Sequence, residues 1–144
     1  MPDNPQEVLE DLKLELRFLE TGGYEPSVHE PRNELNVFRD SPSCLNYALP
    51  VKVHSCSECW LIDFVPASQR SRSTPCHHIP LNERGDTIAS IGKPGNDSKV
   101  QETTREWLRK KIEEFDEWAS TARFHWLQLN LMKLNPKLRL TGKF

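Results

Sequence analysis

Residues 98–134, SKVQETTREWLRKKIEEFDEWASTARFHWLQLNLMKL, contain the longest regular pattern in this chain of 144 residues. Apolar side chains recur in this stretch at alternating steps of four and three residues, which places them on one stripe of a helix. These side chains are Leu108, Ile112, Phe115, Ala119, Ala122, Trp126 and Leu129. With Ser98 as a cap, the pattern predicts a helix over 99–133, about 50 Å long at about 1.5 Å per residue.

This predicted helix is long for a single small domain. Either it breaks near Ser120–Thr121, or its far end packs on another molecule, because its apolar side chains are a large surface to leave in water. Tryptophan concentrates binding energy in protein interfaces. We therefore expect a protein partner or a second copy of the chain to bind this helix. The expected contact residues are Trp107, Trp118, Trp126 and Leu129.

A second helix is predicted over residues 5–21. Asn4 can cap it, Pro5 occupies its first position, and Glu7 lies three residues after the cap, as in a capping box. Its apolar stripe consists of Val8, Leu9, Leu12, Leu16 and Leu19, and two glycines follow. We expect this helix to pack on the near half of the long helix.

The chain between the two helices is expected to be irregular. Only 36% of all residues are hydrophobic and 11 are prolines, so we expect a modest core with an added staple. Short extended segments are predicted at 35–38, 51–53, 79–81 and 87–91, and residues 59–65 suit either a buried strand or one turn of helix that leaves a metal knuckle. The predicted fold class is α+β, small and irregular: a zinc knuckle with short strands, flanked by an N-terminal helix and a long C-terminal helix.

Four cysteines point to a metal site. Their spacing is Cys44-x11-Cys56-x2-Cys59-x16-Cys76, and His77 and His78 follow directly. A Cys-x2-Cys turn presents two sulfurs to one ion, and two more thiolates complete a tetrahedron with bonds of about 2.3 Å. We expect a structural zinc ion on the four cysteines. His77, His78 or His54 could replace one of them.

Other roles for the cysteines stay open. An iron–sulfur cluster could use the same four thiolates, and disulfides, buried thiols, a redox pair or a zinc with an open position are alternatives. The N-terminus has no apolar run of a secretory signal, and no stretch approaches about 18 apolar residues. We therefore expect a cytoplasmic protein without a membrane span, and reducing conditions there favour metal binding over disulfides.

The segment 56–81 resembles the front half of an HNH-type nuclease. In that family a Cys-x2-Cys zinc knuckle precedes a His-His-Ile-x-Pro-like strand, and His77-His78-Ile79-Pro80-Leu81 is similar to that strand. The resemblance implies a divalent metal, His78 as the general base, and Asn82 or Asn96 as a positioning residue. The family's second Cys-x2-Cys and its later metal-binding histidine are missing, since the only later histidine is His125.

The charge is distributed unevenly along the chain. The net charge is −2, yet no acidic residue follows Glu117, so residues 121–144 carry about +5. Nucleic acid is therefore a possible partner, through the Arg70–Arg72 loop and the basic tail, although such proteins usually have a denser positive stripe.

One domain with four segments is expected: an N-terminal helix with a proline-rich wrap (1–43), a Cys-rich metal-binding core (44–95), a long amphipathic helix (96–134) and a basic tail (135–144). The expected function is that of a non-enzymatic, zinc-stapled adaptor or accessory subunit, without catalytic residues. The alternatives are an HNH-like nuclease and a nucleic-acid-binding zinc module.

Overall fold

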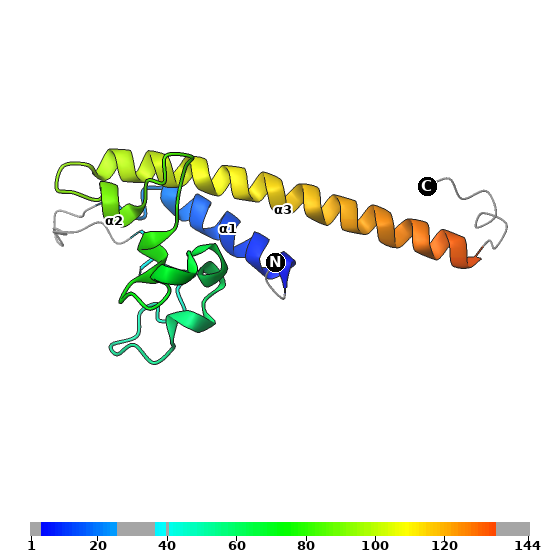
Figure 1. The fold of residues 1–144 in the computed structure, drawn as a ribbon, viewed down its shortest axis with the longest axis horizontal. Coiled ribbons are helices and arrows are strands. Elements are labelled where there is room, and N and C mark those ends of the chain that lie inside the picture. The colour runs from blue at the N-terminus through cyan, green and yellow to red at the C-terminus, as the bar shows by residue number, and fades with distance from the viewer. Residues whose placement is uncertain (1–3, 26–36, 40, 135–144) are drawn as a thin grey trace.

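The computed structural model describes residues 4–25, 37–39 and 41–134, and within these ranges every regular element is helical. The α-helices are α1 (Pro5–Glu20), α2 (Ile88–Ile91) and α3 (Asp97–Leu134). The 3-10 turns are η1 (Cys56–Glu58), η2 (Trp60–Phe64), η3 (Ala67–Gln69) and η4 (Pro75–His78). Figure 1 shows α1 alongside α3, with the short elements gathered near one end of this pair and the rest of α3 projecting from it.

Helix α1 confirms the prediction from its sequence. The side chain of Asn4 accepts a hydrogen bond from the Glu7 amide at 3.4 Å, and Pro5 occupies the first turn. Gly22, with φ of +76°, follows in the left-handed conformation that glycine adopts at the ends of helices. The buried stripe consists of Val8, Leu9, Leu12, Glu15 and Leu19.

Helix α3 runs without the break that was considered near Ser120–Thr121. It lies antiparallel to α1, because Arg109 pairs with Glu20 at 2.8 Å while Lys13, earlier in α1, lies 3.9 Å from Asp116. These pairs are on the surface and add little stability. The apolar seam of α3 provides the stabilising contact with α1, since Leu108 and Phe115 are buried.

Helix α1 covers only the first part of α3, and this cover ends at the N-terminal end of α1. Pro5 lies roughly two helical turns before Lys13, so α1 cannot reach more than about two turns beyond Asp116 on α3. Burial follows this limit: Phe115 is 7% exposed, whereas Trp126 on the same seam is 63% exposed. Figure 1 shows this far part of α3 extending away from α1 and the short elements.

The predicted α+β fold class is wrong, because the part of the chain that the structure describes contains no strand. In the predicted strand 87–91, residues 88–91 form α2 instead, and Thr87 caps it. The Thr87 hydroxyl accepts from the Ser90 amide and the Ser90 hydroxyl accepts from the Thr87 amide, at 3.0 and 2.8 Å. This capping box favours a helical turn over an extended strand.

The other predicted strands fail for related reasons. Of the two alternatives for 59–65, the structure has the helical turn: residues 60–64 form η2, and Leu61 and Val65 are buried four residues apart. A short apolar run cannot distinguish such a turn from a strand. Residues 79–81 and 51–53 belong to no ladder. Of 35–38, residues 35 and 36 lie outside the described residues, and Phe38 has a left-handed φ of 67°.

A buried polar cluster connects α1 to the chain that follows it. Glu15, 1% exposed, accepts hydrogen bonds from the hydroxyls of Tyr24 (2.7 Å), Ser41 and Ser43. The Tyr24 hydroxyl in turn accepts from the Phe38 amide at 3.2 Å. The cluster therefore fixes Phe38 and Ser41 beside α1, close to where the first cysteine, Cys44, occurs.

Replacing Tyr24 by phenylalanine should lower the free energy of unfolding by about 1–3 kcal/mol, because the buried Glu15 carboxylate loses a donor. The measurement is urea denaturation followed by circular dichroism. Tyr47→Phe is the matched control, since Tyr47 is exposed. Equal effects of the two substitutions would contradict the role of this cluster.

The wild type and Tyr24→Phe should also differ in how their stability depends on pH. Burial, reinforced by the charge of Glu15, raises the pKa of Tyr24 above its usual range. A pKa that is higher in the folded chain contributes stability below the unfolded-state pKa of about 10 and loses it as the pH rises further. Above about pH 10 the wild type should therefore lose stability more steeply than Tyr24→Phe.

Candidate metal centre

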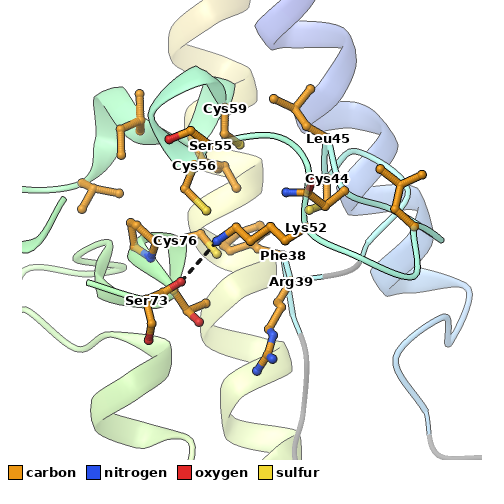
Figure 2. Close-up of a pocket in the computed structure, with 17 residues that line it drawn as sticks. Phe38, Arg39, Cys44, Leu45, Lys52, Ser55, Cys56, Cys59, Ser73 and Cys76 are labelled. Carbon is orange, nitrogen blue, oxygen red and sulfur yellow. Dashed lines mark hydrogen bonds between the residues drawn. The ribbon is translucent and has the colours of Figure 1, made fainter. Parts of the chain in front are cut away.

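All four cysteines line one cavity of about 310 Å³. Cys44 lies in the loop after the buried polar cluster, Cys56 and Cys59 lie in and after η1, and Cys76 lies in η4. Figure 2 shows the four side chains directed into this cavity. All four are free thiols. The structure thus brings together the residues for which the spacing predicted a common site.

Local hydrogen bonds form the Cys56–Cys59 turn. The Ser55 hydroxyl accepts from the Ser57 amide at 3.3 Å, and the Cys59 amide donates to the Cys56 carbonyl at 3.2 Å. This tight 3-10 turn brings both sulfurs to one side of the chain, as a Cys-x2-Cys knuckle requires.

Asn46 holds the loop between Cys44 and Cys56 closed. Its amide nitrogen donates to the His54 carbonyl at 3.0 Å, and its amide oxygen accepts from the backbone amides of Val53 and His54 at 3.0 and 2.9 Å. Because these bonds join residues near both ends of the loop, they keep Cys44 and Cys56 near each other without a disulfide.

Burial keeps two of the thiols protonated. It raises the pKa of Cys59 to about 11 and that of Cys76 to about 12, and the neighbouring sulfurs add to both effects. At neutral pH these two sulfurs are therefore thiols unless a cation replaces their protons. Metal ions do this, since thiolate is the form that binds them.

The donors suit zinc, but their present positions do not yet form a coordination shell. Within the described ranges, no group of three or more Cys, His, Asp or Glu side chains is placed to hold a metal ion. Lys52 also lines the cavity, and its ammonium group donates to the Ser73 carbonyl at 3.5 Å. Binding of an ion would require the sulfurs to move closer together.

The structure places the candidate histidine ligands outside this cavity. His77 Nε2 lies 2.8 Å from the Val37 carbonyl oxygen, and His54 Nδ1 lies 3.6 Å from Glu58. Neither His77, His78 nor His54 is among the lining residues. The four cysteines therefore remain the best candidate ligand set.

The asparagines implied by the nuclease resemblance have local roles. Asn82 accepts from the backbone amides of Arg84 and Asp86 and so forms a turn, and Asn96 donates to the Ile91 carbonyl at 3.2 Å before α3. Neither residue lines the cavity that the cysteines share.

The candidate partner-binding residues fall into two groups. Trp107 is 5% exposed and lies in the core, with its ring against Phe38 and Phe64 at centroid distances of 5.9 and 5.3 Å. Trp118, Trp126 and Leu129 are exposed. The last three are available to a partner, whereas Trp107 stabilises the packing of α3.

Sequence reasoning missed two features of the Cys44–Cys56 loop. One is Lys52, whose role depends on a side-chain direction that spacing does not show. The other is a set of exposed apolar side chains at alternate positions: Leu45, Tyr47, Leu49, Val51 and Val53. The alternation is visible in the sequence, but without a strand nothing indicated that these side chains face water.

Comparison with protein-family models, with curated proteins and with solved structures finds no match for this chain. Among the described helices, none has the length and apolar character needed to cross a membrane. The cysteine-lined cavity and the exposed apolar surfaces are therefore the features of the molecule that bear on its function.

Replacing any one of the four cysteines by serine should weaken zinc binding at least tenfold, because a tetrahedral thiolate site loses one of its four ligands. The measurement is competition with a chromophoric chelator at pH 7.4. His78→Ala, in the same part of the chain but outside the cavity, should bind zinc like the wild type. If His78→Ala lost zinc binding while the cysteine variants kept it, the four-cysteine assignment would be contradicted.

Proposed function

We propose that this protein is a non-enzymatic adaptor that binds a partner protein through the distal segment of α3, residues 118–134. One observation carries the proposal: α3 continues well beyond its cover while keeping large apolar side chains in water. They are Trp118, Phe124, Trp126, Leu127, Leu129, Leu131 and Leu134.

The distal segment has apolar side chains on two opposite sides. Trp126 and Leu129 continue the seam that α1 covers earlier in the helix. Phe124, Leu127, Leu131 and Leu134, at steps of three and four residues, form a second stripe. A helix that is apolar on two sides suits a position between other elements. This favours a partner that encloses the segment, such as a helical bundle or a deep groove.

An adaptor needs a second surface, and the Cys44–Cys56 loop offers one. Its alternate side chains Leu45, Tyr47, Leu49, Val51 and Val53 are exposed, and the Asn46 hydrogen bonds fix the loop's shape. This surface lies on the short elements, away from the distal segment of α3 (Figure 1). Two separate surfaces would let the chain join two partners.

In this proposal a zinc ion would act as a staple, which cross-links the irregular segment and stabilises its fold. The chain between Cys44 and Cys76 has only 3-10 turns as regular structure, so few backbone ladders hold it. One ion bound to Cys44, Cys56, Cys59 and Cys76 would join four points of this segment, and the free energy of metal binding would become free energy of folding. A closed site of four thiolates has no open position for catalysis.

Binding of nucleic acid is the second candidate, favoured by a polar groove of about 460 Å³ next to the cysteine cavity. Lys52, His54, Arg70 and Arg72 line it together with four serines, and no acidic side chain does so within the described residues. Affinity for mixed-sequence RNA or DNA that falls steeply with salt would support this candidate. Salt-independent or undetectable binding would remove it.

The adaptor is tested with a photo-crosslinking amino acid in place of Trp126, in cells that express the full chain. A discrete crosslinked protein is expected from position 126. The matched control is the same amino acid at Lys110, an exposed site on the part of α3 that α1 covers. Equal crosslinking from both positions, or none from position 126, would contradict the proposal.

A substitution separates binding from folding. Trp126→Ser should abolish the specific crosslink from a neighbouring position such as His125, yet change the free energy of unfolding of the isolated chain by less than about 0.5 kcal/mol, because the ring is exposed. Phe115→Ala, on the covered part of the seam, should cost about 3–5 kcal/mol. A large destabilisation by Trp126→Ser would show that the segment packs within its own chain.

A further inference from the structure

Lys52 is a cation without an anionic partner. Its ammonium group donates to the Ser73 carbonyl at 3.5 Å, and the nearby cysteines, Cys56 foremost, raise its pKa. Within the described part of the chain it forms no ion pair with a carboxylate, and no Asp or Glu lines the cavity. Figure 2 shows its side chain extending across the cavity toward the sulfurs.

The backbone keeps this lysine at the cavity. Residues 53 and 54, directly after Lys52, donate to the Asn46 amide oxygen, and Lys52 lies between the first two cysteines of the site. The side chain can therefore swing while its base stays near the sulfurs. Arg39 also lines the cavity, but Figure 2 shows its guanidinium directed away from the sulfurs.

Four thiolates around one Zn²⁺ carry a net charge of −2. Neutral thiols do not balance the positive charge of a nearby ammonium group, whereas a centre with two negative charges attracts it. With sulfurs about 2.3 Å from the metal there is no room for an ammonium group between them. The favourable position for the Lys52 nitrogen is then just outside the sulfurs, within hydrogen-bond reach of Cys56.

From this placement we infer that Lys52 is the counter-cation of a tetrathiolate zinc centre, with its ammonium group on the outer side of the sulfurs. This inference rests on the zinc staple proposed above and assigns it a positioning residue. Groups that contact metal ligands tune the affinity of such sites, and Lys52 would do so by its positive charge.

The test compares the zinc affinities of the full-length wild type, Lys52→Met, Lys52→Arg and Lys93→Met, by competition with a fluorescent chelator at constant pH and ionic strength. Methionine keeps the length of the side chain and removes the charge. Lys52→Met should bind zinc roughly tenfold more weakly, at the lower end of effects for groups next to metal ligands because Lys52 is partly solvated. Lys52→Arg should recover most of the loss, and Lys93→Met, an exposed lysine before α3, should match the wild type.

The outcomes separate this inference from the staple. If the wild type binds one zinc ion and Lys52→Met binds it equally well, the staple holds and the role of Lys52 is overturned. If Lys52→Arg is as weak as Lys52→Met, the position acts by shape and the inference is also overturned. If the wild type binds no zinc, both fail. A tenfold loss that shrinks as salt is raised supports the inference, since salt screens a charge effect.

Discussion

The packing of α1 on the first half of α3 is the contact on which the rest of the structure depends. Leu12 and Leu19 of α1 and Val100 and Leu108 of α3 are all buried in one core. The aromatic rings of Phe64 and Trp107 meet there at 5.3 Å and bring η2 onto the helix pair. Because α1 is much shorter than α3, the same contact also determines where the cover of α3 ends and where its exposed segment begins.

The irregular part of the chain is held differently. Side-chain amides act as local clamps there: Asn46 closes the loop before η1, and Asn82 forms the turn before α2. Such bonds fix short pieces of backbone, but they do not join the pieces to one another. The buried Glu15 cluster joins one piece to α1. A metal ion on the four cysteines would join the others, which explains why a chain with few apolar residues would use one.

Much of this architecture could be predicted from the sequence, because helix signals are local. The cap at Asn4, the proline after it and the steps of three and four in both stripes indicated α1 and α3. The strands could not be predicted correctly, since short apolar runs such as 59–65 fit a 3-10 turn equally well. The Thr87–Ser90 capping box was a local signal for α2 that the β-branched residues around it obscured.

In the candidate site, too, some features could be predicted from the sequence and others could not. The spacing of the cysteines predicted a common metal site; they line one cavity, although within the described ranges no three of them are placed to hold an ion. The position of Lys52 at this cavity, and of His77 against the Val37 carbonyl, depends on side-chain directions that follow from tertiary packing. Likewise, the tryptophans look alike in the sequence, but Trp107 is covered by Phe38 and Phe64, whereas Trp126 lies beyond the end of α1 and is exposed.

The most direct test of this account is the metal content of the protein purified without chelators, measured by native mass spectrometry with thiol alkylation in parallel. We predict one zinc ion per chain and four cysteines that resist alkylation until a chelator is added. A metal-free chain whose four thiols react at once would contradict it. The cysteine cavity would then be an ordinary part of the core, and the function would have to be sought in the exposed surfaces, above all the projecting part of α3.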